Sequence, residues 1–169
     1  EARHELEDYG GNEEDKRELL TLLAFQMMSA GEKSGRTASE ATLKSWLRPR
    51  VVRRRGETEA NKVLREFLRA MAERGSLLNE RDRVYEFIHL SFQEYLCATY
   101  LAHELPDTVA IVDFLRDDGR IADSWWRETI LLTPGYMSTD NRTAALKFIE
   151  RLSARPERDA MALCAAELA

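Results

Sequence analysis

The chain has 169 residues, of which 44% are hydrophobic and 33% are charged, and its formal net charge is −5. This composition supports a buried core, argues against a disordered chain, and does not favour a dedicated nucleic-acid binder, whose domain is usually basic. Cys97 and Cys164 are too few for a disulfide framework or a zinc cluster, so we expect buried free thiols in a reducing, cytoplasmic compartment. The sequence contains no apolar run long enough for a membrane span and no secretory signal at Glu1, and its lack of an initiator methionine suggests a fragment.

Three helices are predicted in the first part of the chain. An N-cap and an acidic first turn predict a helix over residues 12–31. Thr37 and Glu40 have the spacing of a capping box and predict a second, short helix that Pro49 helps to end. A third helix is expected from near Thr58, because its apolar residues recur at helical spacing: Ala60, Val63, Leu64, Phe67, Leu68 and Met71.

A short β-hairpin is predicted after the third helix. Its strands are residues 77–78 and 84–87, and the polar residues 79–82 form the tip. Residues 31–36 predict a turn, with a short strand near Arg36 as an open alternative. Three helices followed by a hairpin are the order of elements in a winged helix.

Residues 87–105, FIHLSFQEYLCATYLAHEL, are the most specific stretch of the chain. Ser91 and Glu94 have capping-box spacing and predict a helix that begins at about Phe92. The residues expected on the buried side of this segment are Ile88, Phe92, Tyr95, Leu96, Thr99 and Tyr100. His89 lies just before the helix, where free N–H groups and the helix dipole favour an anion. A lone histidine beside apolar residues is more often a structural group than a ligand, so both interpretations of His89 stand. In the structural interpretation the chain is a plain helical protein-interaction scaffold.

Short helices with short loops are predicted from Pro106 onward. Their apolar positions cluster in residues 109–115, 125–132, 144–152 and 161–168, and Pro134 and Gly135 are expected to disturb the second of them. This pattern predicts helical hairpins stacked as a HEAT-like solenoid, which continues beyond this piece because the chain stops on an apolar helix face. The fold class is therefore mainly α: a winged-helix domain with an N-terminal linker over residues 1–104, and a helical-repeat region over residues 105–169.

A basic run, RPRVVRRR, occupies residues 48–55. It has three interpretations: a phosphate-binding surface for DNA or RNA, a solvated loop, or a contact with an acidic partner between domains. The cationic residues of the nucleic-acid interpretation are Arg50, Arg53, Arg54, Arg55 and Lys62. The third helix mixes its basic residues with Glu59, Glu66 and Glu73, which makes it a poor phosphate track.

No catalytic or metal-binding motif is present in the sequence. The chain contains no phosphate loop of the form G-x-x-x-x-G-K-[ST], no G-x-S-x-G elbow, no H-E-x-x-H and no C-x-x-C. The three histidines are far apart, so neither a catalytic residue nor a metal ligand is assigned, and we expect the chain not to be an enzyme by itself.

The segment from Phe87 to Ala98 closely resembles the end of the winged-helix region of NACHT-type STAND NTPases, a family that includes the animal NOD-like receptors. The family pattern F-[IL]-H-x-[ST]-F-Q-E-[YF]-[LF]-A-A is matched except at Cys97, where alanine is usual. Arg74 to Leu78 is similar to the entry into the wing, and Trp125 to Glu128 is similar to a W-W-[RK]-E motif of bacterial members.

The resemblance implies a regulatory role. In that family an upstream P-loop NACHT domain binds ATP or ADP, the winged helix closes over the nucleotide, and the histidine of the motif touches the β-phosphate of ADP. On this chain that residue is His89. Exchange for ATP then releases the closed state and the protein forms a homo-oligomer, while the helical repeats act as a sensor. The phosphate loop and the other nucleotide-binding residues of the family have no match here, so no cofactor is expected on this piece alone.

Overall fold

The computed structural model describes residues 13–73 and 77–154. Its contacts divide the chain into two compact units, residues 1–93 and 94–169, and each is described by itself. The division falls inside helix α5 (Leu90–Glu104), so the residues of this helix are assigned to both units. The domain limits expected from the sequence, 1–104 and 105–169, stay a prediction.

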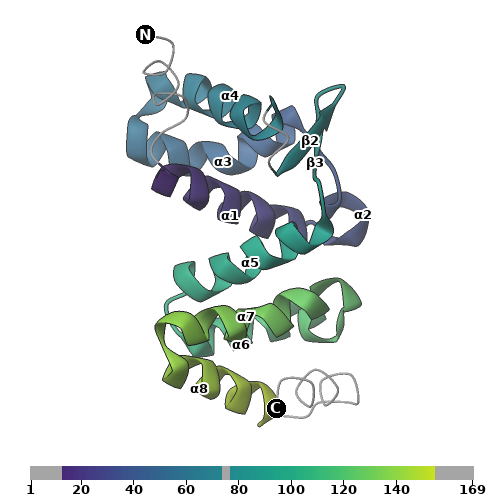
Figure 1. Cartoon of the computed structure of the whole chain (residues 1–169), viewed down its shortest axis with the longest axis vertical. Coiled ribbons are helices and arrows are strands. Elements are labelled where there is room, and N and C mark those ends of the chain that lie inside the picture. The colour runs from purple at the N-terminus through teal and green to yellow at the C-terminus, as the bar shows by residue number, and fades with distance from the viewer. Residues whose placement is uncertain (1–12, 74–76, 155–169) are drawn as a thin grey trace. The chain divides into compact units, whose positions relative to one another are not determined.

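The first unit contains helices and a small sheet in the order of a winged helix (Figure 1). Its elements are α1 (Glu13–Ser29), α2 (Gly31–Gly35), β1 (Ala38–Ser39), α3 (Glu40–Arg55), α4 (Glu57–Glu73), β2 (Leu78–Arg81) and β3 (Val84–Phe87). The antiparallel sheet has the order β1-β3-β2, with Ala38 opposite Tyr85 and Leu78 opposite Phe87. The predicted winged helix is therefore confirmed, and a short strand near Arg36 is present at residues 38–39.

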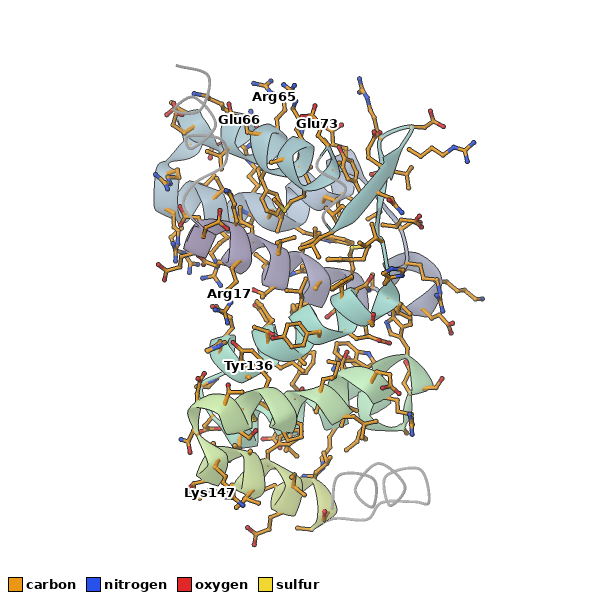
Figure 2. The ribbon with its side chains drawn as sticks, in the orientation of Figure 1. Arg17, Arg65, Glu66, Glu73, Tyr136 and Lys147 are labelled. Carbon is orange, nitrogen blue, oxygen red and sulfur yellow. The ribbon has the colours of Figure 1, made fainter. Side chains whose placement is uncertain are left out.

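The core of the first unit is formed by the apolar faces of α1, α3 and α4. Among the described residues its fully buried side chains include Leu23, Met27, Leu43, Leu47, Leu64, Phe67 and Leu68. The opposite face of α4 is charged, and Arg65 and Glu73 project from it into the solvent (Figure 2). This division of α4 follows the helical spacing of its apolar residues.

Helix α3 differs from the sequence prediction at both ends. Its N-cap is Ser39, whose Oγ accepts a hydrogen bond from the Thr42 N–H at 3.2 Å, so the capping box predicted at Thr37 is wrong. Pro49 lies inside the helix and does not end it. The buried side chains of α3 continue past the proline to Val51, and this packing offsets the hydrogen bond that proline removes.

The wing, β2–β3, turns through two residues with left-handed backbone conformation. Asp82 and Arg83 have φ values of 54° and 62°, a conformation that glycine adopts without strain. The Arg83 N–H donates to Glu80 Oε1 at 2.7 Å, and the Arg83 carbonyl accepts from the Glu40 N–H at 2.9 Å. These bonds hold the strained turn against the start of α3.

Replacing Arg83 with glycine should stabilise the first unit by about 1 kcal/mol, because glycine removes the steric cost of a left-handed side-chain residue. The matched control is Arg81→Gly, an exposed arginine in regular strand geometry, where glycine should destabilise by roughly 0.5–1 kcal/mol. Urea denaturation measures both changes. Equal unfolding midpoints for the wild type and the Arg83 variant would show that the left-handed conformation of Arg83 costs no stability.

In the described part of the second unit, the regular elements are helices and 3₁₀ turns. After α5 come α6 (Thr108–Arg116), the 3₁₀ turns η1 (Asp117–Ala122) and η2 (Ser124–Trp126), α7 (Arg127–Asp140) and α8 (Arg142–Ser153). Asp107 caps α6 by accepting from the Val109 and Ala110 N–H groups, and Asn141 caps α8 by accepting from the Ala144 N–H. Helix α7 runs through Pro134, so the predicted disturbance there is wrong, whereas the helix predicted at 161–168 lies outside the described residues.

The core of the second unit contains both tryptophans of the WWRE motif. Trp125 and Trp126 are buried, and Arg120 stacks on the nearby Phe114 ring at 4.2 Å from its centroid. The Arg120 guanidinium also donates to the carbonyls of Phe114 and Asp117, which fixes the turn after α6. The tryptophans are therefore packing residues, as their large apolar area predicts. None of the helices in the described ranges is both long enough and apolar enough to cross a bilayer.

Cys97 lies on the buried side of α5, and burial raises the pKa of its thiol, although a hydrogen bond with Thr129 partly opposes the shift. In a Cys164→Ser variant, Cys97 should therefore react with a thiol reagent at pH 8 only after unfolding, because both access and the thiolate form are suppressed. Reaction rates with and without urea provide the measurement. Rapid reaction of the folded variant would show that this face of α5 is open.

Candidate functional site

His89 occupies the two-residue connection between strand β3 and helix α5. Before it, the buried ring of Phe87 fixes the end of the strand, and the Ile88 N–H donates to the Leu77 carbonyl at 3.0 Å. After it, the Phe92 N–H donates to the His89 carbonyl at 3.1 Å as the helix begins. His89 is thus the last residue before the helix, where the helix dipole favours an anion.

The imidazole of His89 is exposed. Its ring lies 5.9 Å from the Phe92 ring, with the two planes tilted by 32°. Within residues 13–73 and 77–154, no other side chain forms a hydrogen bond or an ion pair with it. The ring can therefore donate to a group that approaches from outside, without first giving up a partner in the described part of the chain.

The start of α5 differs from the prediction. The helix begins at Leu90, so Ser91 lies within its first turn and the capping box expected at Ser91 and Glu94 is wrong. A capping serine must lie outside the helix for its oxygen to accept from the first turn. The tight turn at residues 88–89, bonded to Leu77, starts the helix earlier than the sequence pattern suggests.

The buried face of α5 also differs from the prediction. Phe92 and Tyr95, expected in the core, are 38% and 46% exposed. The buried residues are instead Gln93, Glu94, Cys97, Ala98, Thr99 and Leu101. The small residues on this face and the hydrogen-bonded amide of Gln93 allow it to be buried. Hydrophobicity alone does not predict that this face, and not the aromatic one, is buried.

Gln93 is a functional candidate that sequence reasoning missed as an individual residue. It is 1% exposed, and its side-chain Nε2 donates to the Gly35 carbonyl of α2 at 3.0 Å. A buried amide is costly unless it is bonded, and this bond provides the partner. The signal in the sequence was its place within the F-Q-E motif, but its partner 58 residues away was not visible.

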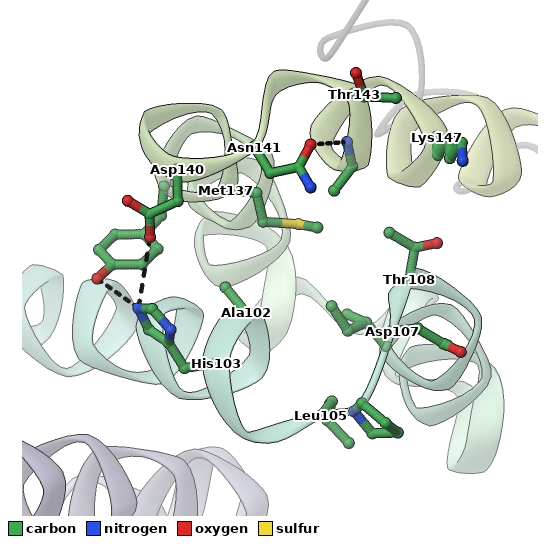
Figure 3. Close-up of a pocket in the computed structure, with 14 residues that line it drawn as sticks. Ala102, His103, Leu105, Asp107, Thr108, Met137, Asp140, Asn141, Thr143 and Lys147 are labelled. Carbon is green, nitrogen blue, oxygen red and sulfur yellow. Dashed lines mark hydrogen bonds and ion pairs between the residues drawn. The ribbon is translucent and has the colours of Figure 1, made fainter.

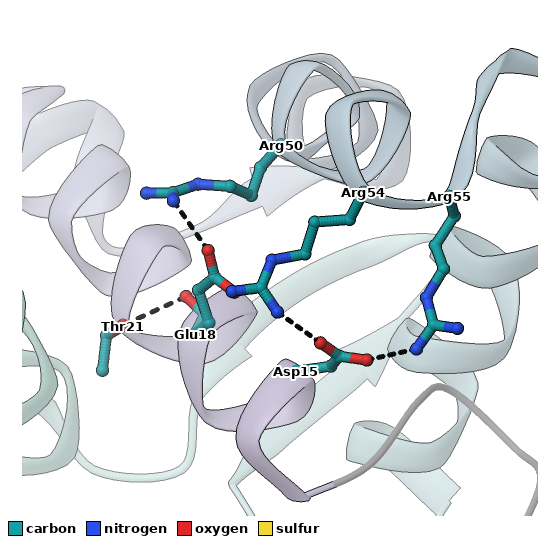
Figure 4. A network of polar contacts seen from close by, with 6 residues as sticks. All are labelled: Asp15, Glu18, Thr21, Arg50, Arg54 and Arg55. Atoms are coloured by element: carbon teal, nitrogen blue, oxygen red, sulfur yellow. Dashed lines mark hydrogen bonds and ion pairs between the residues drawn. The ribbon is translucent and has the colours of Figure 1, made fainter.

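The arginines of the basic run lie on the C-terminal half of α3 and are not in a loop. Arg50 Nη1 lies 2.7 Å from Glu18 Oε1, and Arg54 bridges Asp15 and Glu18 at 2.7 and 2.6 Å, while Arg55 pairs with Asp15 (Figure 4). These five residues, Asp15, Glu18, Arg50, Arg54 and Arg55, form the α1–α3 ion-pair network. Much of the cationic charge is therefore held by carboxylates of α1.

The remaining two residues of the nucleic-acid interpretation lie apart from this network. Arg53 is exposed on α3, and Lys62 is exposed on α4. The structure thus does not gather all five cations around one free surface, and the nucleic-acid interpretation stays a prediction.

The α1–α3 network makes stability depend on pH through Asp15. Burial raises the pKa of this carboxyl, but the hydrogen bonds and charges of Arg55 and Arg54 outweigh it and lower the pKa below the usual 3.8. A lowered folded-state pKa contributes stability that is present above 3.8 and is lost as the pH falls through the folded-state value.

Asp15→Asn should therefore lower the free energy of unfolding by about 1 kcal/mol at pH 7 and low salt, because it removes two charge pairs at a partly exposed site. The difference from the wild type should shrink as the pH falls below the ordinary carboxyl pKa. Glu14→Gln, an exposed neighbour in the same turn, is the control. Denaturation at pH 7 and at pH 2.5 tests the expectation, which fails if the difference is equal at the two pH values.

A pocket of about 420 Å³ lies in the second unit (Figure 3). It is lined by residues from the end of α5, the start of α6 and the α7–α8 connection, including His103, Asp107, Asn141 and Lys147. His103 Nε2 and the Tyr136 hydroxyl form a hydrogen bond of 2.8 Å at its edge. Asp107 and Asn141 cap helices, so these two polar groups of the lining are already used by the fold.

Within the described ranges, no group of three or more His, Cys, Asp or Glu side chains is placed to hold a metal ion. The site thus consists of one exposed histidine at a helix start on a winged helix. Such a site can contact a ligand held elsewhere, but it does not enclose one.

The fold and this site define a winged-helix domain in which an exposed histidine, His89, lies between the last strand and the following helix. Residues 5–101 match the family model described as the winged helix-turn-helix domain C-terminal to NACHT, and the chain belongs to this family. The chain is accordingly a NACHT-associated regulatory domain, joined in this family to a NACHT domain on its N-terminal side. Comparison with curated proteins and with solved structures gives no significant match.

Proposed function

We propose that this chain is the non-catalytic regulatory part of a NACHT-type signal-transduction or defence NTPase of the cytoplasm. In this proposal the winged helix closes over ADP bound by the upstream P-loop domain, and His89 donates a hydrogen bond to the β-phosphate. The observation that supports it best is the exposed imidazole of His89 at the start of α5, on a domain of the family that follows NACHT.

The energy of one contact fits a switch better than a binding site. A hydrogen bond to a charged phosphate contributes about 1.5–3 kcal/mol, which shifts an equilibrium roughly 10- to 100-fold. That amount is enough to bias the closed state but too small to bind a nucleotide alone. The nucleotide-binding residues therefore belong to the NACHT domain, and ATP in place of ADP would favour the open, oligomer-forming state.

The helical second unit has a distinct role in this proposal. Its helices α6, α7 and α8 begin the sensor region, which transmits a signal to the winged helix through the continuous helix α5. Support comes from the capped, well-packed helices of this unit and from the WWRE motif in its core.

His89→Ala in the full-length NACHT protein should accelerate ADP release by roughly 10- to 100-fold and promote oligomerisation without ligand, because the closed state loses its phosphate contact. Stopped-flow release of a fluorescent ADP and light scattering measure the two effects. The control is His103→Ala, an exposed histidine at the other end of the same helix. Unchanged ADP release in the His89 variant would overturn the role of His89.

A further inference from the structure

His89 lies within a closed circuit of backbone and side-chain contacts in the first unit. Strand β3 leads through His89 into α5, and Gln93 of α5 bonds the Gly35 carbonyl of α2. From Gly35 the chain continues into β1, which pairs with β3 through Ala38 and Tyr85. The Gln93–Gly35 hydrogen bond is the contact that closes this circuit.

The Gln93–Gly35 bond connects the buried side of the first turn of α5 to helix α2. Gln93 follows His89 by four residues and lies in the first turn of α5, where its side chain is buried while that of His89 is exposed. The Gly35 carbonyl lies at the C-terminal end of the short helix α2, where carbonyls lack partners within the helix. The Gln93 amide therefore satisfies a buried acceptor and at the same time fixes the position of α5.

In the described part of the chain, the structure gives the buried Gln93 side chain one polar partner, the Gly35 carbonyl. It lies on the buried face of α5, where the next buried turns carry Cys97, Ala98 and Leu101. An apolar residue of similar size would fill the same space, yet it would leave the Gly35 carbonyl without this donor. We therefore assign the Gln93 amide to holding the start of α5 in place through this bond, beyond filling space in the core.

We propose that Gln93 is a positioning residue for His89. By bonding the Gly35 carbonyl, it holds the start of α5 at the angle from which the His89 imidazole reaches the β-phosphate. This inference rests on the proposed function, because it assigns the residue that orients the phosphate contact. It also makes α2 the element whose displacement would move His89.

A double-mutant cycle in the full-length NACHT protein tests the proposal. Gln93→Met keeps the volume and removes the donor, and it should accelerate ADP release about three- to ten-fold. The double variant Gln93→Met/His89→Ala should release ADP at the rate of His89→Ala within about two-fold, because Gln93 acts through His89. Multiplicative effects of the two substitutions, or no effect of Gln93→Met, would overturn the proposal while leaving the phosphate contact of His89 intact. No effect of His89→Ala would overturn both.

Thr99→Val is the matched control. Thr99 is buried on the same helix, but its Oγ1 donates to the Tyr95 carbonyl within the helix at 3.0 Å. It can therefore lose a buried hydrogen bond without opening the circuit around His89. ADP release from this variant should stay within about two-fold of wild type, and a change as large as that of Gln93→Met would assign the effect to general loosening of α5.

Hydrogen exchange in the wild-type chain keeps the proposal testable even if Gln93→Met does not fold. The side-chain amide protons of Gln93 should exchange at least about 100-fold more slowly than those of the partly exposed Gln26, because the Gln93 amide is buried and bonded. Similar exchange rates for the two side chains would show that the Gln93–Gly35 bond opens freely, which overturns the proposal.

Discussion

The turn from strand β3 into helix α5 is the constraint on which the candidate site depends. The buried Phe87 and the bond from the Ile88 N–H to the Leu77 carbonyl fix where the strand ends. The Gln93 amide then fixes where the helix goes, by bonding a carbonyl of α2. Residues 89–92 lie between these two anchored positions, and the imidazole of His89 is exposed at the start of this short segment. An exposed side chain on a backbone held by hydrogen bonds on both sides suits a contact to a ligand held by another domain, because less conformational entropy is lost on binding.

The charges of the first unit illustrate a different constraint. A run of arginines attracts a phosphate only while its charges are free, and here three of them face Asp15 and Glu18 on α1. Partly buried carboxylates next to several guanidinium groups form a network, which holds α3 against α1 more firmly than separate surface pairs would. These arginines of the basic run therefore contribute to the packing of α3 against α1.

A winged helix need not read nucleic acid, and function has to be argued from the site. On this chain the exposed face of α4 mixes acidic and basic residues, whereas the histidine lies at the base of the wing, directly after Ile88, which follows β3. The family match relates the same domain to a NACHT neighbour. In the proposed function, an element order that binds DNA in other proteins supports one regulatory contact instead.

The sequence alone determined the order of the helices, the wing, the core of α4 and the placement of His89 just before a helix. These follow from local rules, namely apolar spacing, turn residues and the family motif. It did not determine the start of α5 at Leu90, the passage of α3 through Pro49 or the exposure of Phe92 and Tyr95. Only the tertiary structure decided these, because each depends on a contact with a distant segment. Val51 is buried on α3 beyond the proline, and Gln93 at the start of α5 bonds the Gly35 carbonyl, 58 residues away; neither the burial nor the bond is visible in the local spacing of the sequence.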